Sequence, residues 1–506
     1  MTTARGTILS GAILAIVVAA YMTFFVAKRL PMTDEGVMMM HAQEFYLGQT
    51  PYAEIESPYT PLAFFVHSTW MRLVGRGLMA NRAAIVLRAA LAAACVAAAT
   101  RSSLGPRGSA AAGAAVVVAT FPYHCYVSYN NYSMFLCIVT ACILLRMSGV
   151  RDLRGAFLSG AVGALAFLAK QNLGGLALVG ACIALFFAGD SWRSRIRLSA
   201  SLCAGAGIVF FLFGMAAAYE GFLGTMLRQA FLGGVDQAEH MATWYPFDQA
   251  SQLAAFLSHP TPRGLDALAH SFSFILPFIV AALLVPMVAA ARTRGREAAW
   301  PLVILATMTP IVALGAVHSP TTWHIIFVKP VPIIAGAFLL KEFSGSRIGK
   351  IAAVMAAACF FTLHLGRQVM IFDEYTGVID APIASGIRTR EWEAGIINKA
   401  LDILRAVPAT EPVFVAAPDP MYYYLTGRTP PLPWIYLDPL FVTEDAGRDI
   451  VERLKRSKSW VLLMTGRNSF YDYTRIRPLT KHLDGAEVHR DENVNGVRIR
   501  LYRPVP

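Results

Sequence analysis

Two adjacent carboxylates, Asp34 and Glu35, directly follow the first long apolar run of this 506-residue chain. A carboxylate within hydrogen-bond reach of a hydroxyl group can take its proton, so either residue could serve as a general base. A local explanation is also open, because Thr33 or Asp34 at the start of a helix can accept hydrogen bonds from its free backbone amides. The two residue types alone do not separate these interpretations.

The segment after the two carboxylates, residues 41–62, is crowded with acidic, aromatic and proline residues. Glu54, Glu56 and Tyr59 are its candidate substrate-binding residues. Acidic groups beside a membrane are costly unless they are solvated or used, so the glutamates are expected to be either solvated or functional. Tyr52 and Tyr59 are equally typical of the aromatic belt at a membrane interface.

Basic and histidine side chains near the outer ends of other apolar runs are the candidate partners of an anion. Lys170 precedes Gln171 at the outer end of a predicted span, where a lysine can also extend to the lipid headgroups. Lys329 lies within an apolar run, so we expect it to face a polar cavity containing either an anionic ligand or a carboxylate. His318 and His324 bracket a short outer loop.

The composition shows which elements must position these residues. Hydrophobic residues make up 56% of the chain and charged residues only 15%, whereas soluble proteins carry about 25% charged residues. The mean hydropathy of +0.50 agrees with a membrane protein. The net charge of +12 comes mostly from short basic clusters between apolar runs, which is a membrane pattern and argues against nucleic-acid binding.

Eleven apolar runs are candidate membrane spans, and the run at 59–74 is ambiguous because it is short and carries His67 and Arg72. If it does not span, the short loops on one side all contain basic residues, and the opposite loops 123–132 and 318–322 contain none. The positive-inside rule then predicts a cytoplasmic N-terminus and an interfacial or re-entrant helix at 59–74. The eleven runs are 7–27, 84–100, 109–122, 133–146, 155–169, 172–188, 198–218, 271–291, 299–317, 323–340 and 349–366.

The predicted fold is therefore an α-helical polytopic membrane domain over residues 1–366, followed by a small α/β domain over 367–506. The membrane domain has two long outer loops, 28–83 and 219–270. In the second domain, helical patterns at 392–406 and 444–456 alternate with strand-like runs at 413–417, 460–464 and 497–502. The topology places this domain outside the cytoplasm.

The seven cysteines lie in or beside apolar runs and form no Cys-x-x-Cys pair. Their odd number and their placement argue against a disulfide framework and against a zinc site. We therefore expect neither a metal ion nor another cofactor.

The first outer loop resembles that of the GT-C membrane glycosyltransferases, which include the protein O-mannosyltransferases and the transferases that modify lipid A. The resemblance rests on Asp34-Glu35 after the first span, a helix ending in Leu47-Gly48-Gln49-Thr50-Pro51-Tyr52, and the turn Pro58-Tyr-Thr-Pro61-Leu62. Gly75 and Arg82 follow as they often do in the family. This chain departs from many relatives in two places. It has Ser57 before the turn, and it has Asn130 and Asn131 where many relatives carry an acidic residue.

The resemblance implies an inverting transfer of a sugar from a polyprenyl-phosphate donor to a glycan, lipid or protein acceptor, at the outer face of a bacterial inner membrane. Asp34 matches the family's base most directly and Glu35 is the second choice. The leaving lipid phosphate needs cations or hydrogen-bond donors. The implied phosphate-binding residues are Lys170, Lys329 and His324, and the implied substrate-binding residues are Glu54, Glu56, Tyr59, Asn130, Asn131, Gln171 and His318.

Two alternatives remain open on the sequence. A transporter or flippase for a lipid-linked glycan would also place polar residues inside a helical bundle, although transporters often show internal repeats with broken helices near the midplane. A non-catalytic protein of the same fold, which binds a lipid-linked sugar or a partner protein, would explain why Asn130 and Asn131 stand where many relatives carry an acidic residue.

Overall fold

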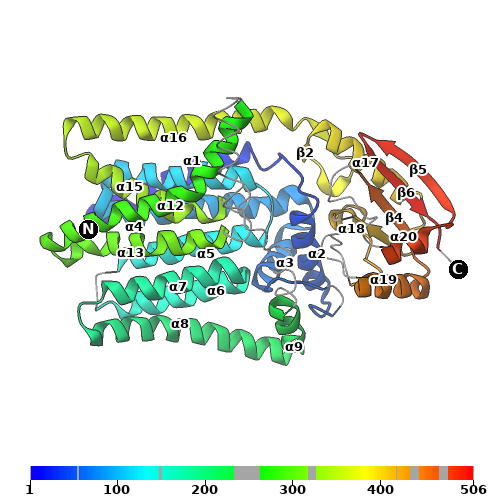
Figure 1. The fold of residues 1–506 in the computed structure, drawn as a ribbon, viewed down its shortest axis with the longest axis horizontal. Helices are drawn as coiled ribbons and strands as arrows, with labels where there is room; N and C mark the ends of the chain where they lie inside the picture. Colours follow the sequence, from blue (N-terminus) through cyan, green and yellow to red (C-terminus); the bar gives the residue numbers. More distant parts are fainter. Residues whose placement is uncertain are drawn as a thin grey trace.

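The computed structural model describes residues 2–53, 56–147, 151–232, 262–316, 326–417, 419–433, 444–466 and 477–504. Figure 1 shows three parts along the long axis of the molecule. A bundle of long helices occupies one end, the short helices α2 and α3 lie in the middle, and the C-terminal sheet and its helices lie at the other end. The N-terminus lies at the end of the bundle away from the sheet.

The bundle consists of long apolar helices that run roughly parallel or antiparallel to one another (Figure 1). Within the part of the chain that the structure describes, five helical segments are long and apolar enough to cross a membrane: Leu78–His124, Gln171–Ala188, Trp192–Tyr219, Leu276–Thr293 and Arg347–Val369. The bundle helices are α1 (Thr2–Thr23), α4 (Leu78–Thr120), α5 (Tyr129–Arg146), α6 (Leu153–Ala169), α7 (Gln171–Ala188), α8 (Trp192–Tyr219), α12 (Pro262–Arg294), α13 (Arg296–Ala313), α15 (Pro330–Phe343) and α16 (Arg347–Glu374). The chain is membrane-embedded, and the count of eleven spans stays a prediction.

Helix α4 joins two of the predicted runs, 84–100 and 109–122, across one kink. Gly105 has a φ of 72° and a ψ of 175°, outside the helical region. Pro106 follows it and has no backbone N–H to continue the helical hydrogen bonds. The kink separates α4 into two helical limbs.

Small residues bring helices α6 and α8 into close contact. A Cβ atom at Gly160 of α6 would lie 1.9 Å from the carbonyl oxygen of Leu202 in α8. A Cβ atom at Gly205 of α8 would lie 2.0 Å from the carbonyl oxygen of Phe157 in α6. Such close backbone contact is typical of packing between membrane helices, where dispersion contacts replace the hydrophobic effect.

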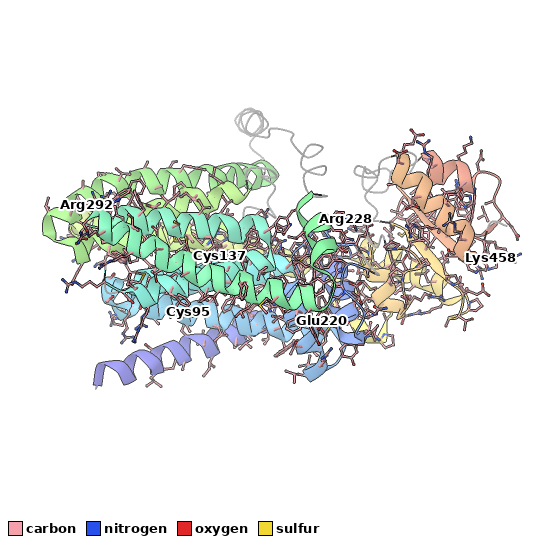
Figure 2. All side chains as sticks on the ribbon, turned by 90° about the horizontal axis from the view of Figure 1, so that it is seen from below. Cys95, Cys137, Glu220, Arg228, Arg292 and Lys458 are labelled. Carbon is pink, nitrogen blue, oxygen red and sulfur yellow. The ribbon has the colours of Figure 1, made fainter. Side chains whose placement is uncertain are left out.

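The ambiguous run at 59–74 forms the short helix α3 (Leu62–Val74), which packs against α2 (Asp34–Leu47). A helix of 13 residues rises only about 20 Å at 1.5 Å per residue, which is too short for the hydrocarbon core. The other outer loop begins with α9 (Leu223–Leu227) and the π-helical turn η2 (Arg228–Leu232). Figure 2 shows Glu220 and Arg228 at the end of the bundle nearer the C-terminal part, with Arg292 at the opposite end.

The C-terminal part contains a four-stranded sheet in the order β3-β4-β6-β5, and strands β3 and β4 are parallel. The strands are β3 (Val413–Ala416), β4 (Trp460–Thr465), β5 (Val488–Val494) and β6 (Val497–Tyr502), and the helices are α17 (Glu391–Arg405), α18 (Met421–Thr426), α19 (Glu444–Ser457) and α20 (Arg477–Leu483). The three predicted strand-like runs are β3, β4 and β6, and both predicted helices are present. A separate two-stranded sheet pairs β1 (Gly377–Val378) with β2 (Arg388–Thr389).

The C-terminal part is joined by backbone contacts to the end of the first predicted span and to the first outer loop. The amide of Arg388 donates to the carbonyl oxygen of Ala27 at 2.6 Å, and the amide of Met421 donates to that of Met32 at 3.2 Å. Helix α18 packs on α2, where a Cβ atom at Gly36 would lie 2.5 Å from the Met421 amide nitrogen. Glycine at position 36 therefore permits this approach, next to Asp34.

Candidate active site

Asp34 is the first residue of α2 and is partly exposed. Its Oδ2 atom accepts a hydrogen bond of 3.0 Å from the hydroxyl of Tyr126. The preceding Thr33 occupies the N-cap position, but its side chain makes no capping hydrogen bond and donates instead to Oδ1 of Asp419 at 3.0 Å. Of the two capping residues considered above, Thr33 does not cap this helix, because its hydroxyl donates to the C-terminal part instead.

A small cavity of about 50 Å³ lies at Asp34. Besides Asp34 and Thr33, its walls include His41, Glu56, Tyr59 and Tyr129. The lining thus combines residues of the first outer loop with the first residue of α5. A volume of this size takes a few water-sized groups.

Tyr126 links Asp34 to a second buried side chain, His124. The Nδ1 atom of His124 lies 2.8 Å from the Tyr126 hydroxyl oxygen. Burial, followed by the nearby charge of Asp34, raises the pKa of Tyr126 well above its ordinary value, so the phenol stays protonated. Because its one proton is donated to Asp34, the His124 Nδ1 atom must be the donor to the phenolic oxygen. The two side chains form a chain of hydrogen bonds that ends on the carboxylate.

Asn131 fixes the turn that carries His124 and Tyr126. Its Nδ2 atom donates to the carbonyl oxygens of both residues, at 2.9 Å and 2.8 Å respectively. Asn131 is completely buried. The structure therefore places this predicted substrate-binding residue behind the Tyr126 turn, where it positions His124 and Tyr126.

Glu35 points away from the cavity and forms an ion pair with Arg82, and both side chains are completely buried. Arg82 donates through Nε to Oε1 of Glu35 at 2.8 Å and through Nη2 to Oε2. The amide of Val127 adds a further hydrogen bond to Oε1 at 3.1 Å. Arg82 also donates to the carbonyl oxygens of Val26 and Arg29, both at 2.7 Å. These contacts occupy the Glu35 carboxylate and tie α4 to the end of the first span.

Lys170 is the single residue between α6 and α7. It lies beside the two tyrosines that form one side of the cavity. Its Nζ atom lies 4.9 Å from the ring centre of Tyr129 and 5.9 Å from that of Tyr59. The two rings stack with centres 3.9 Å apart. Nζ also donates to Oδ1 of Asn130 at 2.5 Å. Burial lowers the pKa of Lys170 to about 8, and the charge of Asp34 acts in the opposite direction.

The remaining predicted site residues are placed as follows. Gln171 donates through Nε2 to the carbonyl oxygens of Pro58 and Ala230, at 2.8 Å and 3.0 Å, and so ties the two outer loops together. Lys329 is half-buried at the residue before α15 and does not line the Asp34 cavity. Glu54, His318 and His324 lie outside the described residues.

A larger and more open groove of about 790 Å³ lies elsewhere, between the end of α16, the start of α17 and the turn after β5. It shares no lining residue with the Asp34 cavity, and it contains the exposed ion pair between Arg390 and Glu374. The larger groove therefore does not hold the carboxylate and lysine described above. Among the residues that the structure describes, no group of three or more His, Cys, Asp and Glu side chains is arranged to hold a metal ion.

Tyr126 and His124 were not among the predicted site residues. Both occur in the short loop 123–132, which has no lysine or arginine and is rich in tyrosine and asparagine. That polar, aromatic composition between two apolar runs was the available signal. The sequence does not show that this loop folds back onto Asp34, about 90 residues earlier.

Comparison with solved structures shows that the chain has the fold of the GT-C membrane glycosyltransferases. ArnT from Cupriavidus metallidurans in the apo state aligns with a TM-score of 0.56 at 14% identity, over 99% of this chain and 98% of that one. ArnT bound to undecaprenyl phosphate aligns with a TM-score of 0.55 at 14% identity, over 97% of both chains. The Archaeoglobus fulgidus oligosaccharyltransferase, in complex with Zn and sulfate, aligns with a TM-score of 0.52 at 12% identity, over 89% of this chain and 67% of that one. No protein-family model and no curated protein matches the sequence.

Proposed function

We propose that this chain is a glycosyltransferase that moves a sugar from a polyprenyl-phosphate donor to a hydroxyl group of a glycan, lipid or protein acceptor. The observation that carries the proposal is the Asp34 cavity. A carboxylate with a fixed hydrogen-bond donor forms one side of it, and Tyr59 and Tyr129, with the Lys170 ammonium against their rings, form another. This arrangement suits a reaction that takes a proton from one group and releases an anion from another.

In the proposed reaction, the acceptor oxygen attacks the anomeric carbon of the donor sugar. The new carbon–oxygen bond forms as the bond between the anomeric carbon and the phosphate oxygen breaks, and the polyprenyl phosphate leaves with both bonding electrons. Asp34 takes the acceptor proton. Tyr126 holds Oδ2 of that carboxylate, which directs the Oδ1 atom toward the acceptor. Attack opposite the leaving phosphate inverts the anomeric configuration.

Lys170 is the proposed partner of the leaving phosphate. It is a cation at the outer ends of two bundle helices, and its ammonium group lies against both tyrosine rings of the cavity. An ammonium group in a partly buried site stabilises a developing phosphate charge more strongly than one in water. Asn130 holds the Lys170 Nζ atom, so this predicted substrate-binding residue is proposed to position the lysine.

Glu35 is proposed to act as a positioning residue. Its two oxygen atoms are bound by Arg82 and by the Val127 amide. Protonating a carboxylate in a buried ion pair would leave the arginine without its partner. The division of roles between the two adjacent carboxylates favours Asp34 as the base.

The structural neighbours and the arrangement of the helices support the proposed donor and location. One ArnT structure contains undecaprenyl phosphate, which is the lipid phosphate that such a reaction releases. In Figure 1, the turns between α7 and α8 and between α15 and α16 lie at the end of the bundle away from the sheet. Basic residues cluster near these turns, including Arg193, Arg195, Arg347 and Lys350. The positive-inside rule makes this end cytoplasmic, with the C-terminal part outside a bacterial inner membrane.

The proposal is tested with purified protein in nanodiscs, a panel of radiolabelled polyprenyl-phosphate sugars and a membrane glycolipid extract. We expect label to move from one donor to an acceptor, and we expect the movement to be lost in Asp34→Asn. A parallel measurement in sealed proteoliposomes distinguishes a transferase from a flippase, because it follows whether the labelled donor crosses the membrane. A labelled donor that crosses the membrane unchanged, at the same rate in wild type and Asp34→Asn, would contradict the proposal.

A further inference from the structure

The open groove of about 790 Å³ at the end of α16 has a polar lining and one large aromatic side chain. Its volume lies within the range of about 300–1,000 Å³ that is typical of ligand sites. The groove is open to solvent, so a ligand of several rings can enter it. The lining residues are Glu374, Thr376, Arg390, Glu391, Trp392 and Asn495.

Trp392 presents an aromatic surface to this groove. It is the second residue of α17 and is 50% exposed. The apolar residues that follow it on the same helix, Ala394, Ile396 and Ile397, are buried. The packing of α17 therefore leaves half of the largest apolar side chain of its first turn uncovered. Such a side chain offers a wide and rigid contact surface to a ligand.

The hairpin turn between β5 and β6 holds Trp392 in place. Asn495 and Gly496 are the two residues of this turn, and their φ values are 53° and 81°. Two consecutive positive φ values are typical of the tight hairpin turn that favours Asn-Gly. The Nδ2 atom of Asn495 donates to the carbonyl oxygen of Trp392 at 2.9 Å. The aromatic and amide groups of the groove are therefore fixed relative to each other before a ligand binds, which lowers the cost of binding.

The charged groups of the groove suit hydroxyl groups better than an anion. Arg390 donates to Oε2 of Glu374 through Nε at 3.0 Å and through Nη2 at 2.7 Å. Oε1 of Glu391 accepts from the Thr376 hydroxyl at 3.3 Å. Arg388 lies beside the groove and donates to the carbonyl oxygen of Thr376 at 3.2 Å. These two carboxylates and two guanidinium groups balance in charge, so they provide no excess positive charge for a phosphate.

A carbohydrate matches both kinds of surface in this groove. The C–H groups on one face of a sugar ring pack against the negative face of an aromatic ring. The hydroxyl groups of a sugar both donate and accept, so they fit a mixture of carboxylate, guanidinium and amide groups. A peptide would use apolar pockets or an unpaired strand edge, and none of the six lining residues belongs to a strand.

The groove lies just beyond the apolar part of α16. Figure 1 shows that this helix leads from the bundle to the C-terminal part. Its membrane-spanning segment ends at Val369, and Glu374 is the last residue of the helix. At 1.5 Å per residue, Glu374 lies about 8 Å farther along the axis, whereas the headgroup layer is about 5–8 Å thick. The groove is therefore at the level where the head of a membrane lipid meets water.

The groove is also connected to the chain segment that leads to Asp34. Tyr375 lies between two lining residues, and its carbonyl oxygen accepts from Nζ of Lys28 at 3.0 Å. The carbonyl oxygen of Lys28 accepts from Sγ of Cys125 at 3.3 Å. Tyr126 follows Cys125 and donates to Asp34. Because the groove and the Asp34 cavity share no lining residue, a ligand that reaches both must contain several sugar rings.

We infer that this groove binds the oligosaccharide part of a glycolipid acceptor, with one sugar ring on Trp392 and its hydroxyl groups on Glu391 and Asn495. A more distant sugar of the same acceptor presents its hydroxyl group to Asp34, and the lipid part stays in the membrane. The inference rests on the proposed function, which leaves the acceptor open among glycan, lipid and protein. The groove contributes affinity away from the reacting atoms and takes no part in the bond changes.

The test measures the binding of fluorescently labelled oligosaccharides to the purified full-length protein in phosphatidylcholine nanodiscs. The oligosaccharides are released by mild acid from the membrane glycolipid extract and separated by length. We expect the longer fractions to bind wild type, and we expect Trp392→Ala to raise their Kd about tenfold. Trp392→Phe keeps an aromatic face and should recover part of the affinity.

Trp192→Ala is the matched control. Trp192 is 64% exposed and is the first residue of α8, which Figure 1 places at the end of the bundle away from the C-terminal part. Its Kd for the oligosaccharides should equal that of wild type. A tryptophan that only anchors the protein in the headgroup layer would not affect the binding of a soluble oligosaccharide, so an unchanged Kd in Trp392→Ala would overturn the inference.

A second variant keeps the test decisive if Trp392→Ala does not fold. Glu391→Gln leaves the tryptophan in place and replaces a charged acceptor of hydroxyl hydrogen bonds by a weaker one, so the Kd should rise several-fold. An unchanged Kd in Glu391→Gln, or the absence of binding by every fraction to wild type, would also overturn the inference. Competition by phosphatidylglycerol in the nanodiscs would show that the groove takes a lipid headgroup instead of a glycan.

The failure of this site and the failure of the proposed function give different results. In the transfer assay, Trp392→Ala should raise the KM for the glycolipid acceptor about tenfold and leave the Kd of the donor as in wild type. If label is transferred and the acceptor KM is unchanged in Trp392→Ala, the groove assignment is wrong and the transferase stands. If oligosaccharide binding depends on Trp392 but no donor gives transfer, the groove stands without the transferase.

Discussion

Tyr126 donates its phenolic hydrogen to the Oδ2 atom of Asp34 at 3.0 Å, although the two residues lie 92 positions apart in the sequence. This contact brings the loop between α4 and α5 onto the start of α2. It distinguishes Asp34 from the neighbouring Glu35, whose carboxylate is held by Arg82. One carboxylate of the pair faces the cavity and the other holds the fold together.

Replacing Tyr126 by phenylalanine removes this hydrogen bond and leaves the ring in place. Hydrogen bonds to charged groups contribute about 1.5–3 kcal/mol, so kcat for transfer should fall roughly 10- to 100-fold. Tyr123→Phe is the matched control, since Tyr123 bonds to His364 and does not contact Asp34. Steady-state kinetics of both variants check the prediction, and a comparable loss of kcat in Tyr123→Phe would contradict it.

The buried ion pair between Glu35 and Arg82 predicts that replacing Glu35 lowers stability, whereas replacing Asp34 lowers activity alone. Removing one partner of a buried ion pair typically costs about 3–5 kcal/mol, so Glu35→Gln should lower the Tm of the detergent-solubilised protein sharply. Asp34→Asn should leave the Tm close to that of wild type, because Asp34 is only partly buried. Glu492→Gln, which breaks an exposed pair with Lys399, should have little effect. Equal Tm losses in Asp34→Asn and Glu35→Gln would refute this separation.

Lys170 predicts a pH dependence of donor binding. Its pKa is lowered to about 8 by burial, so the side chain is cationic below that pH and becomes neutral as the pH rises through it. The KM for the donor should therefore increase above about pH 8. In Lys170→Arg the side chain stays cationic, so the KM for the donor should not increase between about pH 8 and about pH 10. The same pH profile in both proteins would show that another group is responsible.

The close contact at Gly36 predicts that the C-terminal part must approach the first outer loop tightly. In Gly36→Ala the new Cβ atom would lie 2.5 Å from the backbone of Met421. This distance is too short, so α2 and α18 would have to move apart. We expect a destabilisation of about 1–3 kcal/mol, as for other overpacked sites. Gly11→Ala is the control, because no atom lies within 4 Å of its Cβ position. Thermal unfolding and limited proteolysis between residues 374 and 421 measure the effect, and equal behaviour of the two variants would contradict the prediction.

The sequence predicted the elements better than their contacts. The lengths of the apolar runs located the bundle helices, and the alternation of Val497 to Tyr502 located strand β6. The kink in α4 was visible as two separate runs, because Gly105 and Pro106 interrupt the apolar pattern. Glu54, His318 and His324 lie outside the described residues and stay predictions.

The site was predicted in part, because residue type indicates chemistry while the fold decides which groups meet. Asp34 and Tyr59 were candidates and line one cavity, and the candidate Lys170 lies against the Tyr59 ring. Glu35 has the same chemistry as Asp34, but only the position of Arg82 shows that its carboxylate is occupied.

The central claim is that Asp34 takes the proton of the acceptor. The most direct measurement compares wild type and Asp34→Asn in transfer from the donor that the panel identifies, together with the Kd of that donor for each protein. Losing a general base typically costs about 10²- to 10⁴-fold in rate. We predict a loss of kcat in this range with an unchanged Tm and a Kd within about threefold of wild type, because the asparagine keeps the shape of the site. Transfer by Asp34→Asn at the wild-type rate would contradict the account.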